Sequence, residues 1–261
     1  MREIILAALL GFASMAQAAD DSPRTLSVLC YNIHHGEGTD GKLDLGRIAR
    51  VIKEAKPDLV ALQEVDKNTT RTGQVHQAAE LARLTGMQGS FARAIDFRGG
   101  EYGLAMLSRF PLKGVNPHPL PGKEKQESRI VMEATVEPKG FPAITLLNTH
   151  LQHDDGETRE KQAARIDELY ARTEGPVVLA GDLNASPGSA PIKTLSRTWS
   201  FATEPGGKGL LSYPSDTPKQ QIDFVLFKPV GKFKVIEAKV IEEKVASDHR
   251  PVLVVLEWVR K

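Results

Sequence analysis

The sequence contains one cysteine, two tryptophans and almost no net charge, and each scarcity excludes a class of protein. Its 261 residues include 34 lysines and arginines and 33 aspartates and glutamates, which gives a formal net charge of +1. With so small a net charge, the protein has no overall electrostatic field that would attract it non-specifically to nucleic acid or anionic membranes. The single cysteine, Cys30, can form neither an intramolecular disulfide nor a thiolate zinc site, and its apolar neighbours predict a buried side chain.

Apolar runs long enough to cross a membrane are also missing. The apolar stretch from Ile4 to Met15 is too short, and no later segment approaches the ~20 apolar residues of a membrane-spanning helix. Arg2 precedes this stretch and Ala16-Gln17-Ala18 follows it, a pattern typical of a signal peptide and its cleavage site. Residues 1–18 are therefore predicted to be a signal peptide cleaved near Ala18/Ala19, and the protein to be exported, either periplasmic or secreted. A buried N-terminal helix is the alternative.

The remainder of the chain, residues 19–261, is predicted to form a single α/β (α+β) domain. Its 41% of hydrophobic residues suffices for a sizeable core, which excludes a disordered, collagen-like or coiled-coil protein. Short β-rich runs alternate with three amphipathic segments, and hairpins interrupt any regular βαβ ladder. A sandwich of two mixed sheets with helices outside would bury both patterns. The expected strands are 25–31, 58–65, 104–108, 129–136, 143–150, 176–180, 222–227, 235–241 and 252–258, and the expected helices follow Asp44 and cover 75–84 and 157–172.

One glycine-rich segment has the spacing of a dinucleotide-binding motif. Gly36 to Gly41 spells GxGxxG between a predicted strand and a predicted helix, with the acidic Glu64 near the end of the next strand. That motif requires the glycines to lead directly into the helix. Here His34 and His35 precede the glycines, and Asp44 provides a separate helix cap after them. We therefore interpret the segment as a flexible loop.

Polar side chains gather at the ends of the apolar runs. Carboxylate, amide and imidazole groups at strand ends converge if the strands are neighbours, and functional sites are commonly built on such loops. Carboxylates with asparagine, without cysteine, form a hard oxygen site that suits Mg²⁺ or Mn²⁺. A divalent ion beside histidines in a predicted exported hydrolase favours a phosphate ester as substrate. The residues in these positions are Asn32, Glu64, His150, Asp182, Asn184, Asp223 and Ser247-Asp248-His249.

Each of these residues alone has a structural explanation. A single Asp-Leu-Asn is usually a turn or a helix cap, and a single Ser-Asp-His usually lies on the surface. A serine hydrolase would use the same residue types, but the sequence contains no G-x-S-x-G elbow. No HExxH zinc motif occurs either. The functional interpretation therefore depends on the combination of residues.

In this order, the motifs resemble the endonuclease/exonuclease/phosphatase (DNase I-like) superfamily, and most closely its exported bacterial branch. The resemblance covers the whole mature chain and implies a four-layer α-β-β-α sandwich with two central mixed β-sheets. It also implies a metal-dependent hydrolase of phosphoesters. The motifs are YNIHHG (31–36), PDLVALQEVD (57–66), GEYGLAMLSRFPL (100–112), NTHLQH (148–153), GDLNASP (181–187), QIDFVL (221–226) and SDHRPV (247–252).

The resemblance also implies roles for individual residues. Glu64 resembles the principal metal ligand, with Asn32 and Asp248 completing or approaching the metal site. Asp182 and Asn184 resemble the pair that orients the attacking water and holds the phosphate. The implied catalytic histidines are His249, held by Asp223, and His150. Arg129 matches a position where relatives often direct an arginine toward the phosphate, although a surface arginine at a strand start is an equally open interpretation.

The substrate stays open at this stage. Two segments that could form DNA-binding loops, 113–125 and 206–219, hold scattered lysines without interleaved aromatic residues. We expect a monomeric phosphodiesterase or phosphatase that uses Mg²⁺ or Mn²⁺ and acts on a phosphoester outside the cytoplasm. A secreted DNA or RNA endonuclease is the alternative within this class. A non-catalytic module of the same fold that binds metal or phosphate is the alternative from another class.

Overall fold

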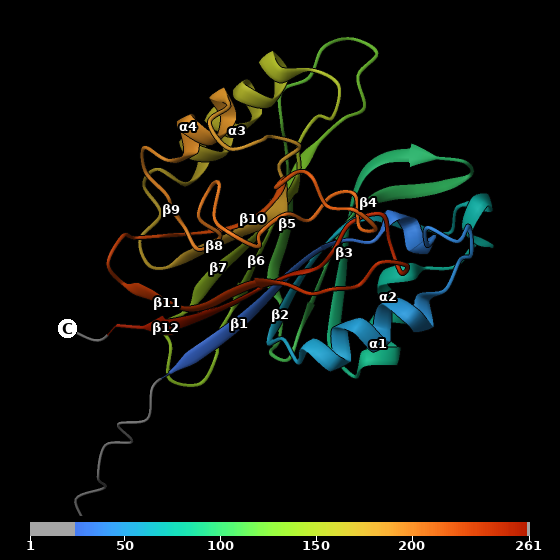
Figure 1. The fold of residues 1–261 in the computed structure, drawn as a ribbon, viewed down its shortest axis with the longest axis horizontal. Coiled ribbons are helices and arrows are strands. Elements are labelled where there is room, and N and C mark those ends of the chain that lie inside the picture. Colours follow the sequence, from blue (N-terminus) through green and yellow to red (C-terminus); the bar gives the residue numbers. More distant parts are fainter. Residues whose placement is uncertain (1–23, 260–261) are drawn as a thin grey trace, which may run out of the picture.

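Two mixed six-stranded sheets lie face to face in the computed structural model, which describes residues 24–259 (Figure 1). The predicted signal peptide at residues 1–18 lies outside the described residues. The first sheet has the strand order β11-β12-β1-β2-β4-β3. Its members are β1 (Thr25–Asn32), β2 (Leu59–Lys67), β3 (Gln88–Phe97), β4 (Gly100–Ser108), β11 (Phe233–Val240) and β12 (Val252–Trp258).

The second sheet has the strand order β5-β6-β7-β8-β10-β9. Each sheet contains one parallel pair, β1 with β2 and β7 with β8, while the other neighbours are antiparallel. The strands of the second sheet are β5 (Lys113–Pro119), β6 (Ile130–Val136), β7 (Ile144–His150), β8 (Val177–Asp182), β9 (Ser200–Phe201) and β10 (Asp223–Lys228).

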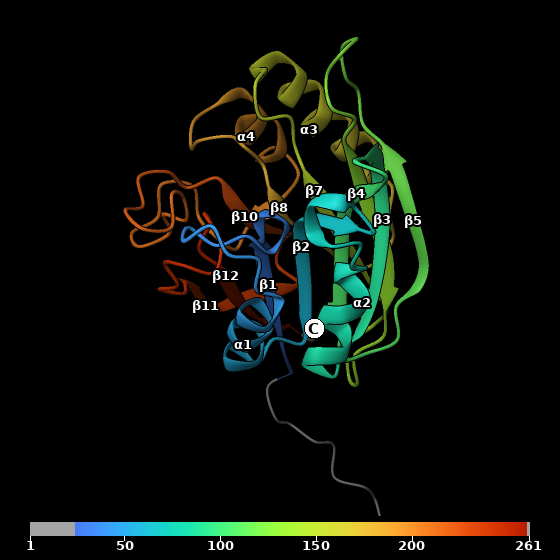
Figure 2. The ribbon, with the colours of Figure 1, turned by 90° about the vertical axis from the view of Figure 1, so that its right-hand side faces the viewer.

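Helices cover the outer face of each sheet and complete four layers (Figures 1 and 2). One apolar cluster fills the space between the sheets, a second lies between the first sheet and α1 and α2, and a third lies between the second sheet and α3 and α4. The predicted four-layer sandwich is therefore confirmed. Within residues 24–259, no helix has the length and apolar character needed to cross a membrane. The helices are α1 (Leu45–Ala55), α2 (Gln77–Thr85), α3 (Gly156–Tyr170) and α4 (Ala190–Leu195), with short 3₁₀ turns η1 (His34–Gly36) and η2 (Thr70–Thr72).

Helix α1 forms where its sequence pattern predicts. Asp44 caps it by accepting a hydrogen bond from the Arg47 backbone N–H at 2.8 Å. Its apolar residues Ile48, Val51 and Ile52 are buried against the first sheet. The helix ends at Lys56, which adopts a left-handed conformation before a proline. The glycine-rich segment precedes this cap and does not lead into the helix, which agrees with our rejection of a dinucleotide motif.

Three strands and one α-helix of the structure are absent from the sequence prediction. Strand β3 is half exposed and lacks a clear apolar alternation, β9 has two residues, and α4 has six. Residues 113–119, interpreted above as part of a loop, form β5, so that interpretation is wrong. Its two prolines concealed it, and they are tolerated because β5 is an edge strand.

Glu64 lies inside β2, whereas the apolar run predicts it at the end of the strand. Pairing between β2 and β4 shifts register between Leu62 and Val65, and the strand then continues to Lys67. This β-bulge contains Glu64, whose φ of 57° is left-handed and costs energy for a non-glycine residue. Bulges re-aim side chains, and this one redirects the Glu64 carboxylate.

Asn148 links the two sheets next to this bulge. Its side-chain amide on β7 donates to the backbone carbonyls of Leu62 and Ala105, at 2.8 Å and 2.9 Å, in the opposite sheet. Its Oδ1 accepts a hydrogen bond from Gln63 Nε2 at 2.6 Å. All of these groups are buried, where water cannot reach them. Each hydrogen bond lost would therefore leave a polar group without a partner.

Replacing the side-chain amide of Asn148 is expected to destabilise the fold more than the loss of so few atoms suggests. Asn148→Ala should lower the free energy of unfolding by about 2–4 kcal/mol, because buried polar groups without partners cost roughly 1–3 kcal/mol each. Urea unfolding followed by circular dichroism would measure the change. Asn116→Ala, on the exposed edge strand β5, is the matched control and should change it by less than about 0.5 kcal/mol. Equal effects of the two substitutions would contradict the inter-sheet role of Asn148.

Candidate functional site

The predicted site residues converge because of how the strands run. The carboxyl ends of β1, β7 and β8 and the amino ends of β10 and β12 lie at one edge of the sandwich. Register pairs Asp182 directly with His150 on one side and with Asp223 on the other. A pocket of about 410 Å³ opens at this edge, and the predicted residues that line it are Glu64, Arg129, His150, Asp182, Asn184, Asp248 and His249. The two other predicted residues, Asn32 and Asp223, do not line the pocket and lie behind the side chains that do.

Asn32 connects the two halves of the site. Its Nδ2 donates to Glu64 Oε1 at 3.0 Å in its own sheet and to Asp182 Oδ2 at 3.1 Å in the other sheet. Its Oδ1 accepts a hydrogen bond from the His34 backbone N–H. In this structure Asn32 therefore orients two carboxylates, and its amide would have to turn over for its oxygen to bind a metal ion.

Asp182 is buried at the end of β8. Its Oδ1 accepts a hydrogen bond from the Asn184 backbone N–H at 2.9 Å, which fixes the turn after the strand. The preceding Gly181 is required here, because a Cβ at that position would lie 2.3 Å from the Thr149 carbonyl oxygen of β7. Any side chain would push the two strands apart and displace the carboxylate.

Asp223 and His249 form a buried pair. His249 Nδ1 lies 2.9 Å from Asp223 Oδ2, which also accepts a hydrogen bond from Ser212 Oγ at 2.5 Å. Because the carboxylate accepts at Nδ1, the other ring nitrogen faces the pocket, 3.7 Å from Asp182 Oδ2. The ring of Tyr213 lies over His249 with centroids 4.8 Å apart. The predicted Asp–His geometry is thus present.

Excess negative charge at the base of the pocket shifts the pKa values of this group. Burial, with Asp223 close by, raises the pKa of Asp182. For His249, burial opposes the charged form, but Asp223 and Asp182 outweigh it and raise the pKa to about 10. The two buried carboxylates therefore hold a proton that a cation could replace.

His150 and Arg129 form the opposite wall. Arg129 is only 5% exposed, so the surface interpretation of this residue is wrong. Its Nη1 lies 3.1 Å from His150 Nδ1 and 2.8 Å from Glu127 Oε1. Since arginine can only donate, Nδ1 must accept and the ring proton of a neutral His150 lies on Nε2. Burial, followed by the charge of Arg129, lowers the pKa of His150 well below its usual range and keeps the ring neutral.

Arg71, Phe97 and Tyr102 also line the pocket, and the sequence prediction does not include them. Buried Asp66 binds Arg71 through both Nε (2.7 Å) and Nη2 (2.8 Å). The guanidinium group lies 4.7 Å from the centre of the Phe97 ring and 5.6 Å from that of Tyr102. Phe97 comes from the unpredicted strand β3, and no local motif marks Arg71. Only their common position on the pocket wall identifies them.

The side chains of the pocket suit a hard divalent cation. Glu64, Asp182 and Asp248 present carboxylates to it, while its two arginines are already paired with Asp66 and Glu127. Oxygen donors of this kind favour Mg²⁺ or Mn²⁺. Among the described residues, one oxygen of Asp223 is buried without a hydrogen-bond partner, a further sign of unbalanced negative charge beside the pocket.

Comparisons with known proteins agree with this architecture. A family model described as "Endonuclease/Exonuclease/phosphatase family" matches residues 29–249, a span that includes every predicted site residue. No protein in the curated set matches the chain.

Solved structures show the same fold at low sequence identity. An endonuclease/exonuclease/phosphatase from Beutenbergia cavernae is 25% identical with a TM-score of 0.71, over 90% of this chain and 72% of that one. A family protein from Bacteroides thetaiotaomicron is 18% identical with a TM-score of 0.77, over 91% and 99% of the two chains. A mannosyl-6-phosphatase from the same organism is 19% identical with a TM-score of 0.71, over 88% and 99%. These likenesses confirm the predicted DNase I-like sandwich.

Without metal, the protein is expected to lose stability as the pH rises from 6.5 to about 8. The pKa of folded His249 lies above its ordinary value, so the stabilisation from its charge is complete below pH 6.5 and is lost as the pH rises toward 10. The raised pKa of Asp182 likewise makes the folded protein less stable as the pH rises. Urea unfolding in EDTA across this range would measure the slope, and His249→Gln should reduce it. Stability that stays constant or rises from pH 6.5 to about 8 would contradict the raised pKa values of His249 and Asp182.

Proposed function

The chain belongs to the endonuclease/exonuclease/phosphatase family, whose members usually hydrolyse phosphoesters, and on that premise we propose that it is a divalent-metal-dependent phosphoester hydrolase. The observation that carries the proposal is the buried Asp223–His249 pair directed at Asp182, in a pocket shared with Glu64 and Asp248. A protein that only bound phosphate would have no need for a proton-accepting pair held in this way.

Asp182 and His249 are proposed to accept the proton of the attacking water. Asp223 fixes the His249 tautomer so that Nε2 faces Asp182 across 3.7 Å. With the proton of His249 released, as expected when a cation occupies the pocket, a water held between these two groups would have an acceptor on each side. Because the charge of each group shifts the pKa of the other, the pair titrates as one unit, and we assign the base to the pair.

His150, Asn184 and Arg129 are proposed to hold the phosphate. The His150 Nε2–H group faces the pocket as a neutral donor, and Asn184 Nδ2, which donates to the Leu151 carbonyl, lies 3.0 Å from it as a second donor. Arg129 fixes the ring from behind and brings a guanidinium group to the pocket wall. Donors placed in this way stabilise charge that develops on phosphoryl and leaving-group oxygens.

Glu64 and Asp248 are proposed to hold Mg²⁺ or Mn²⁺, with Asn32 orienting the Glu64 carboxylate. The ion would neutralise phosphoryl charge and assist departure of the leaving oxygen. The surplus of carboxylates at the base of the pocket supports this assignment, because phosphate would otherwise be repelled.

A small phosphoester is the favoured substrate. The pocket volume of about 410 Å³ is in the range for small ligands, and the Arg71–Phe97 stack lines part of it. The net charge of +1 gives no general attraction to a polyanion, which disfavours but does not remove the nuclease alternative. Export and a monomeric state are further parts of the proposal and are supported by the sequence alone.

Hydrolysis of an aryl phosphodiester or phosphomonoester should require added Mg²⁺ or Mn²⁺ and stop with EDTA. Asp182→Asn should lower kcat by about 10²–10⁴-fold, the usual contribution of positioned acid–base groups. Asp96→Asn replaces an exposed aspartate on β3 that is not among the residues lining the pocket, and as the matched control it should keep full activity. A panel with sugar phosphates, inositol phosphates, sphingomyelin, RNA and plasmid DNA would identify the substrate. Chelator-resistant activity, or full activity of Asp182→Asn, would contradict the proposal.

Arg129→Lys keeps the charge but loses the planar fork that contacts His150 and faces the pocket. We expect kcat/KM to fall by roughly ten- to a hundred-fold, the equivalent of one lost charged hydrogen bond. Arg165→Lys on the exposed face of α3 is the control. Steady-state kinetics with the best substrate of the panel would measure both variants, and an unchanged kcat/KM in Arg129→Lys would exclude its role.

A further inference from the structure

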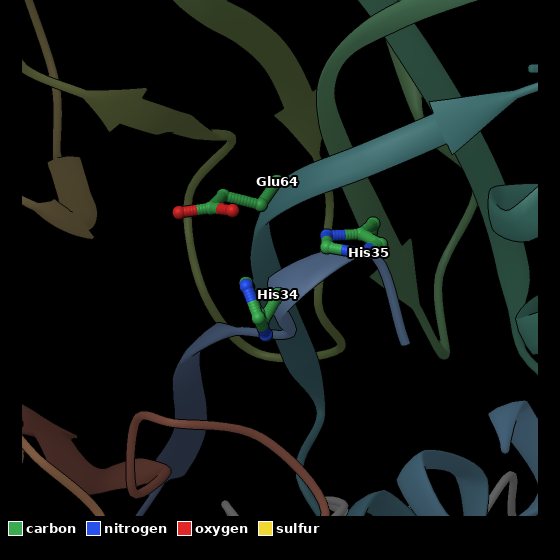
Figure 3. Close-up of side chains that lie close together, drawn as sticks. All are labelled: His34, His35 and Glu64. Carbon is green, nitrogen blue, oxygen red and sulfur yellow. The ribbon is translucent and has the colours of Figure 1, made fainter. Parts of the chain in front are cut away.

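Two histidines lie beside Glu64, on the side away from the Asp223–His249 pair. Ligand atoms of His34, His35 and Glu64 lie within 4.8 Å of one another, and Figure 3 shows the two rings and the carboxylate around a common space. We propose that these three residues bind a second metal ion, of the first-row transition series. The roles proposed above use neither histidine.

Glu37 leaves each imidazole with one nitrogen available. His34 Nδ1 lies 3.2 Å from the Glu37 carbonyl oxygen, and His35 Nε2 lies 3.4 Å from the Glu37 carboxylate. Both of these oxygens can only accept, so each contacted nitrogen carries the ring proton. His34 Nε2 and His35 Nδ1 therefore keep their lone pairs. This arrangement, in which a carbonyl or carboxylate holds the far nitrogen, is typical of metal-binding histidines.

The surroundings of His35 Nδ1 are a second, independent observation that points to a ligand. His35 is 8% exposed, and this nitrogen is buried without a hydrogen-bond partner among the described residues. Gln77 holds the segment in place by donating a 2.6 Å hydrogen bond to the His35 carbonyl. Buried acceptors without partners are rare in native proteins, and a bound ion would satisfy this one.

The donor set predicts which ion binds. Two imidazoles with one carboxylate suit Mn²⁺, Fe²⁺ or Zn²⁺, whereas Mg²⁺ prefers oxygen ligands alone. Glu64 has two carboxylate oxygens, and Asn32 donates to one of them. The same side chain can therefore serve both the oxygen-rich site proposed with Asp248 and the histidine site. The resulting centre would hold two different ions with Glu64 between them.

Metal binding, measured without reference to hydrolysis, tests this site. The purified protein would be stripped with EDTA, saturated with Mg²⁺, and titrated with Mn²⁺ in equilibrium dialysis. We expect one Mn²⁺ per chain that excess Mg²⁺ does not displace, and nitrogen couplings in its pulsed EPR spectrum. His34→Gln and His35→Gln should each remove that ion and the couplings. Glu37→Gln, which removes no ligand, should weaken binding by about 10–100-fold.

Matched controls separate ligand loss from misfolding. His118→Gln replaces a half-exposed histidine on β5 and should bind Mn²⁺ like the wild type. His35 is buried, so circular dichroism in EDTA would establish that each variant folds, and the less buried His34 supplies the second variant. Wild-type protein without nitrogen couplings, or a folded His34→Gln variant with unchanged Mn²⁺ binding, would overturn the proposal. Because the readout is binding, a failure to hydrolyse phosphoesters would leave this result unaffected.

Discussion

The β-bulge that contains Glu64 is the constraint on which the rest of the site depends. It turns a residue inside a buried strand so that its carboxylate reaches the pocket, at the cost of a left-handed backbone. Side-chain amides from both sheets stabilise the arrangement, with Asn148 bonded to the backbone beside the bulge and Asn32 to the Glu64 carboxylate. The Asn148 bonds, together with the bond from Asn32 to Asp182, hold the two sheets in register at the edge where the site lies.

Unbalanced negative charge is the second organising feature. Asp182 and Asp223 are buried side by side, and the His249 ring lies between them, with one nitrogen toward each carboxylate. Such an arrangement is costly unless a proton or a metal ion neutralises it. The placement of these carboxylates therefore determines both the stability of the metal-free protein and the metal binding on which the proposed function depends.

Much of the fold and the main acidic and histidine residues of the pocket could be predicted from the sequence, because buried strands appear as apolar runs and their polar ends converge. The prediction failed where that signal is weak. Strand β5 contains prolines, β3 is half exposed, and the apolar run around Glu64 does not reveal the bulge. Arg71 reaches the pocket through tertiary contacts with Phe97 and Asp66, which no local motif records. Likewise, the orientation of the Asn32 amide depends on a backbone N–H that the sequence cannot place.

Proton release on metal binding tests the central claim most directly. Titration calorimetry with Mg²⁺ near pH 7, repeated in buffers of different ionisation enthalpy, gives the number of protons released per bound ion. If the ion replaces the proton held by Asp182 and His249, binding should release a substantial fraction of one proton, and Asp223→Asn should reduce that fraction. Mg²⁺ binding without proton release, or no Mg²⁺ binding, would contradict the account.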